Sequence, residues 1–453
     1  MIAPTVNMTK RVNFFKGYIL RISFISALGG YLFGFDFAVI SGALPFLRSA
    51  FALSPWWEGF LTGSLALGCI AGCLIAGKIA DSYGRKPGLL IAAGTFAVSS
   101  LGMAISPNLP WFLAMRFSAG IGVGMASMLS PLYIAEISPA HIRGRNVAIN
   151  QLTIVLGILI TNLVNYLFSD KGTDAWRWMF GLGVVPSLLF LAGALFLPES
   201  PRWLILKGRV EKATAVLSRI GSDQYVRDSI EKADKMTIPK NGSYREVFAK
   251  SVRPLVFIGI CLAVFQQLCG INVVFNYTST IFKSVGANLN EQLLETVVIG
   301  IVNVLFTLIA MWQVDRLGRR PLMLTGSIGL AIIYLSLAYL LQSQASVVLI
   351  SIFVLLAIGL YATSLAPVTW VLISEIFPNR IRSAASSIAI VSLWLAYFIL
   401  VFTFPVLAEY LGAYGPFYLY AVICFLGFLF IKTKVRETKG QTLEELEENF
   451  IGH

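Results

Sequence analysis

The chain has 453 residues, of which 57% are hydrophobic and 13% are charged, whereas an ordinary soluble domain carries about 25% charged residues. Twelve apolar runs are each long enough to cross a bilayer as a helix of about 20 residues, and their length and uniform apolarity exclude a membrane β-barrel. The net charge of +12 does not indicate nucleic-acid binding, because with a cytoplasmic N-terminus all but five of the 35 Lys and Arg residues fall on the cytoplasmic side.

The apolar runs predict an all-α polytopic membrane protein with both termini in the cytoplasm. No cleavable signal peptide is predicted, since the first run is too long and no small-residue cleavage site follows it. The basic cytoplasmic side predicts contact with anionic membrane lipid. The runs lie at about 20–47, 57–80, 88–107, 111–137, 147–168, 178–197, 254–283, 292–314, 321–342, 346–373, 383–408 and 414–432.

Three pairs of short motifs recur in the same order at nearly one offset. They are "DSYGRKP" at 81–87 with "DRLGRRP" at 315–321, "EISPAHIR" at 136–143 with "EIFPNRIR" at 375–382, and "ESPR" at 199–202 with "ETKG" at 437–440. Each unit has an even number of helices, so both copies enter the membrane from the same side. The sequence therefore predicts two parallel six-helix repeats, which is the arrangement of the major facilitator fold.

The duplication divides the chain into four segments. Residues 1–197 are expected to form a first six-helix bundle and residues 254–432 a second one. Residues 198–253 are expected to be a cytoplasmic linker with short amphipathic helices, and residues 433–453 a cytoplasmic tail.

The repeated motifs place acids and bases together at the cytoplasmic helix ends. These charges could form an inner gate that closes in one state and breaks in the other, or they could be topogenic charges and solvated loops. The repeated acids favour the gate, because the positive-inside effect does not require acids. The candidates are Asp81, Arg85, Glu136, Arg143, Glu199 and Arg202 in the first copy, and Asp315, Arg319, Glu375 and Arg382 in the second.

Longer motifs identify a family. The segments "GGYLFGFD", "RFSAGIGVGMASMLSPLYIAEISPAHIRGR", "PESPRWL", "FQQLCGINVVFNY" and "GLYATSLAPVTWVLISEIFP" resemble the sugar porter family of the major facilitators over residues 18–445. That family includes bacterial proton-coupled xylose, arabinose and galactose symporters and animal glucose facilitators. The resemblance implies a monosaccharide substrate, alternating access, function as a monomer and no cofactor. The N-x-S/T sequences at Asn7, Asn241 and Asn276 fall in predicted cytoplasmic or membrane segments and do not indicate a glycosylated ectodomain, so a bacterial inner membrane is the expected location.

The resemblance also implies a substrate site made of amides and aromatic rings. Amides donate and accept hydrogen bonds, and rings cover the C–H surface of a sugar, so a neutral sugar needs no charged ligand. For each residue the alternative is a polar contact between membrane helices. The matching residues are Gln151, Gln266, Gln267, Asn272, Asn303, Trp370 and Trp394. Leu393 is apolar where many relatives carry an amide, and Ile158 is apolar where the xylose symporter has a second glutamine. These departures leave the particular sugar open.

The seventh predicted helix carries a candidate outer gate. Gly270 interrupts its amide-rich stretch, and glycine allows a membrane helix to unwind where it lines a cavity. Asn272 and Asn276 are four residues apart and therefore share one face. Asn276 and Tyr277 occupy the positions of an aromatic lid in many relatives, although Asn276 is not aromatic.

Asp36 and Arg116 are the two charges expected deep in the membrane. Asp36 lies about 16 Å below the outer end of its helix and Arg116 about 8 Å below the end of another, so the two can pair. Family members that couple transport to protons carry this pair. An unpaired charge costs at least about 2.5–3.5 kcal/mol at the membrane centre, so a permanent salt bridge is one interpretation. A proton switch is the favoured one, although Gly183 stands where the xylose symporter has an acid.

The leading hypothesis is therefore a proton-coupled monosaccharide symporter. A facilitative uniporter of the same fold is the alternative, and a sugar sensor is less favoured because the tail is short. No nucleophile, metal or acid–base constellation indicates an enzyme, and the five cysteines lie in apolar runs without metal-ligand spacing.

Overall fold

The structure is a computed structural model that describes residues 5–235, 247–249, 252–377 and 381–437. Within these ranges, the side chains of residues 5–16, 140–141, 232–235, 314–316, 374–375 and 382–383 are outside the description. The described part contains 12 helical spans long and apolar enough to cross a membrane. This confirms the predicted all-α, twelve-span architecture.

The first half of the molecule contains the first six spans and the second half contains the other six. The first half consists of α1 (Thr5–Phe51), α2 (Pro55–Ser82), α3 (Arg85–Ala104), α4 (Leu109–Ile137), α5 (Ala140–Phe168), η1 (Gly172–Asp174), α6 (Ala175–Gly181) and α7 (Val184–Phe196). The second half consists of α12 (Arg253–Leu268), α13 (Ile271–Asn276), α14 (Thr278–Lys283), α15 (Leu289–Leu317), α16 (Arg319–Gln342), α17 (Val347–Thr363), α18 (Leu365–Glu375), α19 (Arg382–Leu411) and α20 (Gly415–Lys434). Three short helices join the halves: α8 (Pro201–Leu206), α9 (Val210–Leu217) and α10 (Asp223–Lys235).

Several helix starts follow from local sequence. The side chains of Ser54 and Asn108 accept hydrogen bonds from backbone N–H groups in the first turns of α2 and α4. Asn288 and Glu291 form a reciprocal capping box at the start of α15. These caps fix where the membrane helices begin.

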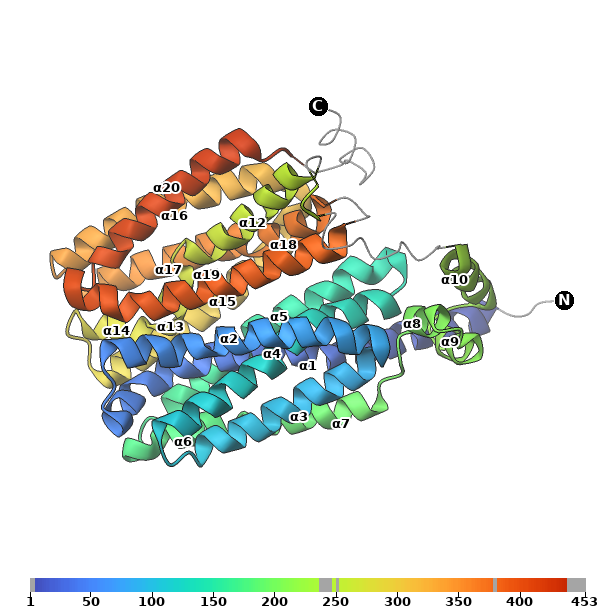
Figure 1. The fold of residues 1–453 in the computed structure, drawn as a ribbon, viewed down its shortest axis with the longest axis horizontal. Coiled ribbons are helices and arrows are strands. Elements are labelled where there is room, and N and C mark those ends of the chain that lie inside the picture. Colours follow the sequence, from blue (N-terminus) through green and yellow to red (C-terminus); the bar gives the residue numbers. More distant parts are fainter. Residues whose placement is uncertain (1–4, 236–246, 250–251, 378–380, 438–453) are drawn as a thin grey trace.

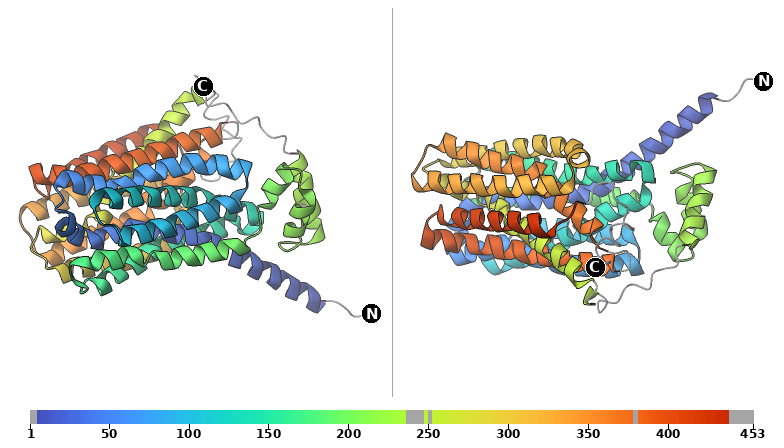
Figure 2. Two further views of the ribbon diagram at one scale, coloured as in Figure 1. Left: turned by 60° about the horizontal axis from the view of Figure 1, so that its bottom comes forward. Right: turned by 90° about the horizontal axis from the view of Figure 1, so that it is seen from above.

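The two halves lie side by side, and α8–α10 lie beyond one end of the first half (Figure 1). We call this the linker end, and the opposite end, which carries the turn between α1 and α2, the far end. Figure 2 shows the same arrangement from two other directions, with α8–α10 again beyond the bundle. The indole of Trp203 in α8 donates a hydrogen bond to the backbone carbonyl of Asp81 at 3.1 Å. This bond ties the linker helices to the end of α2.

Small residues bring α2 and α4 into close contact. A Cβ added at Gly68 or Gly72 would collide with backbone carbonyl groups of α4, and one added at Gly120 or Gly124 would collide with those of α2. Membrane helices approach closely at such small residues. This packing fixes the helix that carries Arg116 against its neighbour.

Contacts between the halves gather at the far end. The Nδ2 of Asn162 on α5 donates to the carbonyl of Thr296 on α15 at 2.7 Å, and the hydroxyl of Ser279 donates to the carbonyl of Ser41 at 2.8 Å. A Cβ added at Gly59 on α2 would collide with the backbone of α19. At the linker end, α4 and α18 pack mainly against helices of their own halves. The bundle is therefore closed at the far end.

Candidate functional site

The seventh span is broken at Gly270, inside the apolar run predicted at 254–283. Gly270 has a φ of +92° and separates α12 from α13, and an added Cβ would lie 2.6 Å from the ring of Tyr420. Glycine adopts this left-handed conformation without steric cost. The predicted unwinding at Gly270 is confirmed, and it positions the polar residues on either side.

A row of hydrogen-bonded amides crosses this break. Gln266 donates from Nε2 to the hydroxyl of Tyr361 at 2.8 Å, and Gln267 donates from Nε2 to Oε1 of Gln266 at 2.6 Å. Asn272 then donates from Nδ2 to Oε1 of Gln267. We call Tyr361, Gln266, Gln267 and Asn272 the amide row. Its three amides are buried, so three predicted substrate residues lie together.

The two predicted gate residues are held by α19. Asn276 is fully buried, donates to the carbonyl of Asn272 at 2.6 Å, and accepts a hydrogen bond from the hydroxyl of Tyr397 at 3.2 Å. Tyr277 donates to the carbonyl of Val401 at 2.7 Å. The segment from α13 to α14 is therefore fastened to α19 in this state.

The other four predicted substrate residues lie on four different helices. Asn303 on α15 is buried and Gln151 on α5 is half-buried. Neither makes a hydrogen bond to the residues that the structure describes. Trp394 on α19 is buried, and its ring meets that of Phe33 edge-on at 5.7 Å. Trp370 on α18 is 42% exposed.

Asp36 and Arg116 lie in contact, and both side chains are completely buried. Oδ1 of Asp36 is 3.4 Å from Nη1 of Arg116, whereas charge-assisted hydrogen bonds are usually about 2.7–2.9 Å long. Arg116 also donates from Nε to the carbonyl of Leu61 at 3.0 Å. Oδ2 of Asp36 and Nη2 of Arg116 have no partner among the described residues. The pair is thus loose and only partly satisfied.

Besides the Asp36–Arg116 pair, two acids near the ends of their helices are wholly or partly shielded from solvent. Glu58 in the first turn of α2 is buried. Glu295, in the second turn of α15, is half-buried and accepts a hydrogen bond from Ser351 on α17 at 2.6 Å. The hydropathy pattern alone did not distinguish these shielded acids from the solvated charged residues at the ends of other helices.

The predicted charge cluster of the first half is partly assembled. Arg85 binds Glu136 through two hydrogen bonds of 2.8 Å, from Nε and Nη2. Glu199 accepts from the backbone N–H of Arg85 at 2.8 Å. Arg143 and Arg202 are exposed and make no ion pair with the described residues. Asp81 is exposed as well, and its backbone carbonyl is the acceptor for Trp203.

The second half repeats one of these contacts. Glu437 accepts from the backbone N–H groups of Arg319 and Arg320, both at 3.0 Å. Gly84 and Gly318 precede α3 and α16 with φ values of +107° and +90°. A Cβ added at these glycines would collide with the carboxylate of Glu199 and would lie 2.9 Å from that of Glu437. The weak echo of "ESPR" in "ETKG" is thus a structural equivalence. The side chains of Asp315, Glu375 and Arg382 lie outside the described part.

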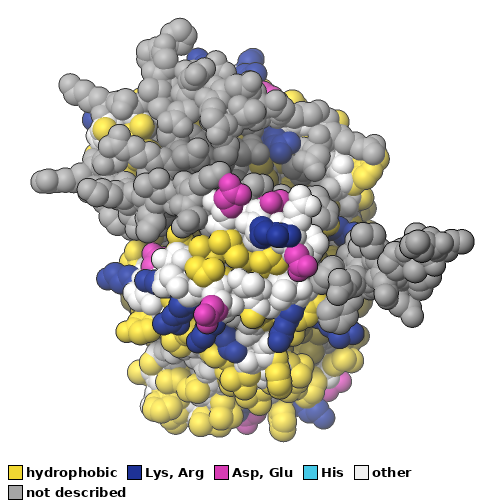
Figure 3. Space-filling view, turned by 90° about the vertical axis from the view of Figure 1, so that its right-hand side faces the viewer, with side chains coloured by type: hydrophobic (Ala, Val, Ile, Leu, Met, Phe, Trp, Pro, Cys, Tyr) yellow, Lys and Arg dark blue, Asp and Glu magenta, His cyan; other side chains and the backbone are white. Residues whose placement is uncertain are grey.

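Basic side chains surround the linker end of the first half, next to acidic ones (Figure 3). They include Lys78, Lys86, Arg145 and Lys207, which belong to α2, α3, α5 and the segment after α8. This agrees with the charge asymmetry of the sequence.

Sequence reasoning missed a cluster at the far end. Arg48 binds Glu58 through Nε and Nη2, both at 2.5 Å, and its Nη2 also donates to Oγ1 of Thr280 at 2.5 Å. We call Arg48, Glu58 and Thr280 the far-end latch, because it joins the two halves beside a cavity of about 340 Å³. An Arg and a Glu on either side of a short turn were a local signal for the Arg48–Glu58 pair. Thr280 gave no such signal, because it is 232 residues away from Arg48 in the chain.

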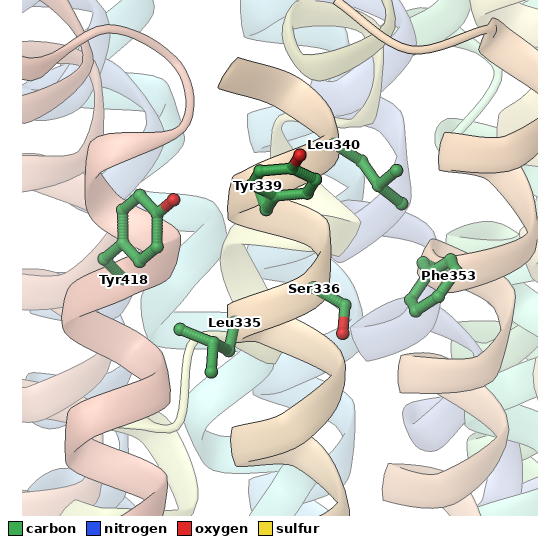
Figure 4. Close-up of a pocket in the computed structure, with 6 residues that line it drawn as sticks. All are labelled: Leu335, Ser336, Tyr339, Leu340, Phe353 and Tyr418. Carbon is green, nitrogen blue, oxygen red and sulfur yellow. The ribbon is translucent and has the colours of Figure 1, made fainter. Parts of the chain in front are cut away.

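Another cavity lies away from these groups (Figure 4). It measures about 390 Å³ and is lined by residues of α16, α17 and α20: Leu335, Ser336, Tyr339, Leu340, Phe353 and Tyr418. These residues belong to the second half alone and include no member of the amide row or the buried pair. The cavity is therefore separate from the candidate site.

Comparisons with known proteins agree with this geometry. A family model described as "Sugar (and other) transporter" matches residues 22–450. The D-xylose-proton symporter of Escherichia coli (strain K12) is 38% identical over 474 residues, covering 95% of this chain and 96% of that protein. The putative metabolite transport protein YwtG of Bacillus subtilis (strain 168) is 39% identical over 438 residues, covering 94% of each chain.

Solved structures give the same result. The inward open conformation of the xylose transporter XylE from E. coli matches with a TM-score of 0.85 at 36% identity, covering 96% of this chain and 100% of that one. The same transporter bound to 6-bromo-6-deoxy-D-glucose matches with a TM-score of 0.80, at 36% identity and over 96% of this chain and 99% of that one. The chain therefore belongs to the sugar transporter family of the major facilitator superfamily.

Proposed function

We propose that the protein is a proton-coupled monosaccharide symporter that works by alternating access. The buried Asp36–Arg116 pair carries this proposal, because its two charges are loosely matched and leave one atom each without a partner. Burial favours the neutral acid and a guanidinium favours the carboxylate, so a small change in geometry can move a proton. Relatives named as xylose and arabinose proton symporters support it.

The amide row is the proposed sugar site. Its side chains, with the unpaired amides of Gln151 and Asn303, offer donors and acceptors to a neutral, hydroxyl-rich ligand. Trp370 and Trp394 would cover the apolar face of the ring. No metal or cofactor is part of this proposal.

We further propose that the linker end is cytoplasmic and that the structure is inward-facing. Contacts between the halves at the far end and the basic side chains at the linker end support this orientation. The far-end latch would then be the outer lock of this state, and the Arg85–Glu136 cluster would contribute to the inner gate when the halves rock.

Uptake into proteoliposomes tests the proposed function. The purified protein is given a panel of pentoses and hexoses, with and without an imposed proton gradient. One proton moving through 100 mV supplies about 2.3 kcal/mol, which allows nearly 50-fold accumulation of a neutral sugar. Uptake that never exceeds equilibration with any sugar would contradict symport and favour the facilitative uniporter.

Gln267→Ala is expected to weaken sugar binding about tenfold. The change removes one amide of the row and takes away the partner of Oε1 of Gln266 and of Nδ2 of Asn272. A buried hydrogen bond contributes about 0.5–1.5 kcal/mol. Equilibrium binding of the transported sugar measures the loss. Gln342→Ala is the control, since Gln342 is exposed at the end of α16. If the two variants bound the sugar with equal affinity, Gln267 would not be part of the sugar site.

Thr280→Val is expected to open the far end more often. The variant keeps the shape of the side chain but removes the hydroxyl that Arg48 binds across the halves. Because Arg48 is partly exposed, we expect the inward-facing state to lose about 1 kcal/mol of stability relative to the outward-facing state. This is a roughly fivefold shift of the equilibrium toward the outward-facing state. A cysteine placed at the buried Ser41 and reacted with an impermeant maleimide reports that opening.

The matched control for this measurement is Thr278→Val. Thr278 is buried near the half-buried Thr280, but its hydroxyl bonds to Val274 within its own half. The cysteine at Ser41 should react at the same rate in the control as in the parent protein. Faster reaction in the control than in Thr280→Val would show that the latch does not hold the halves.

A further inference from the structure

One face of α20 lies along the broken seventh span. Tyr420, Cys424 and Gly427 occupy positions i, i+4 and i+7 of this helix and therefore share that face. We call these three residues the α20 stripe. A Cβ added at Gly427 would collide with the ring of Phe265 in α12, and one added at Gly270 would lie 2.6 Å from the ring of Tyr420. The stripe thus supports the last turns of α12 as far as the break.

The break leaves backbone carbonyls of α12 without their usual partners. In an unbroken helix the carbonyl of Cys269 would accept from the N–H of Val273, but that N–H donates to the carbonyl of Gly270 at 3.0 Å. The thiol of Cys424 replaces it, since it donates to the carbonyl of Cys269 at 3.5 Å. The carbonyl of Gln266 accepts from the thiol of Cys269 at 3.0 Å. Two thiols therefore cap carbonyls that the break has freed.

The peptide between Cys269 and Gly270 joins the two parts of the amide row. Gln267 precedes this peptide and Asn272 follows it, and the side chain of Asn272 donates to that of Gln267 across the break. If the peptide rotates, the carbonyl of Cys269 turns with it and Asn272 moves relative to Gln267. The bond from Cys424 resists that rotation, because it holds the carbonyl in one direction.

We propose that Cys424 is a positioning residue for sugar binding, because its thiol holds the peptide that joins the two parts of the amide row. This inference rests on the proposed sugar site. The thiol of Cys424 makes no hydrogen bond to the side chains of the row among the described residues, so it acts through the backbone. Binding groups that are already in place cost less free energy to order when the ligand arrives.

Cys424→Ala tests the inference by equilibrium binding of a panel of pentoses and hexoses to the purified, folded protein. The variant should bind the preferred sugar about threefold more weakly, since a thiol is a weak donor and one hydrogen bond is lost. Cys261→Ala is the control, because Cys261 is a half-buried thiol in α12 that makes no hydrogen bond with the described residues. If both variants bind the sugar as the parent does, the positioning role of Cys424 is overturned.

The same change in an Asn272→Ala background separates positioning from general stability. In that background the row has no side chain beyond the break for Cys424 to place. Adding Cys424→Ala should therefore cause no further loss of affinity, which is the non-additivity expected of coupled residues. A purely structural role would lower the melting temperature and leave the affinity of the folded protein unchanged. An equal loss of affinity in both backgrounds also overturns the inference.

A second variant keeps the test decisive if Cys424→Ala does not fold. Tyr420→Leu removes the ring that lies against Gly270, and it should weaken binding in the parent but not in the Asn272→Ala background. Tyr420→Phe is its control, because the hydroxyl of Tyr420 has no partner among the described residues. A parent that binds sugar while Tyr420→Leu binds as its control does overturns the role of the stripe alone. A parent that binds no sugar of the panel overturns the proposed sugar site, and this inference with it.

Discussion

Asp36→Asn should abolish accumulation of sugar against a gradient while leaving counterflow intact. The amide resembles the protonated acid, a state that the proposed cycle already visits, so the variant should fold and exchange sugar. It cannot release a proton, so the nearly 50-fold accumulation allowed at 100 mV should fall to equilibration. Uptake with an imposed gradient, paired with counterflow in the same vesicles, measures both quantities.

Glu295→Gln is the matched control for this experiment. Glu295 is another acid inside a membrane helix, and its partner Ser351 can donate equally well to an amide oxygen. This variant should accumulate sugar as the wild type does. Accumulation by Asp36→Asn above equilibrium would contradict the proposed switch and leave the pair a structural salt bridge.

Gly120→Val should prevent recovery of folded protein. Gly120 lies on α4 against the backbone of α2 near Leu65, where an added Cβ would collide with a carbonyl group. Overpacking a core costs about 1–3 kcal/mol when side chains can move, and a helix backbone can move far less. We therefore expect a larger loss of folding stability than this and little monodisperse protein in detergent.

Gly94→Val separates this effect from the general cost of replacing a helical glycine. Gly94 lies within α3, and a Cβ added there would meet no atom within 4 Å. Its size-exclusion profile and melting temperature should remain close to those of the parent. A stable Gly120→Val protein would show that α2 and α4 can separate in this bundle.

The sequence was sufficient for features that depend on local pattern or on repetition. Apolar run length predicts the twelve spans, and Gly270 predicts the break in the seventh span because glycine tolerates a left-handed backbone. Opposite charges at similar depth predicted that Asp36 and Arg116 would meet. The duplicated motifs predicted equivalent turns, of which the structure describes a shared contact at Glu199 and Glu437.

The remaining contacts depend on how the two halves are placed, and no local pattern encodes that. Thr280 meets Arg48, and Asn162 meets Thr296, only because the bundle is closed at the far end. Tyr397 was one aromatic residue among many in an apolar run. Repetition likewise could not tell which arginine of the first copy pairs with Glu136, and the structure assigns Arg85.

The acids at positions 199 and 437 have a consequence for the order of synthesis. Each follows the last span of its half and binds the turn between the second and third spans, 114 and 118 residues earlier in the chain. In each half, this contact is thus made by the acid that follows the last span of that same half, and not by a residue of the other half. The first half can complete its helix contacts before the second has left the ribosome, as domains generally do, so a chain interrupted after Glu199 contains everything that this closure needs.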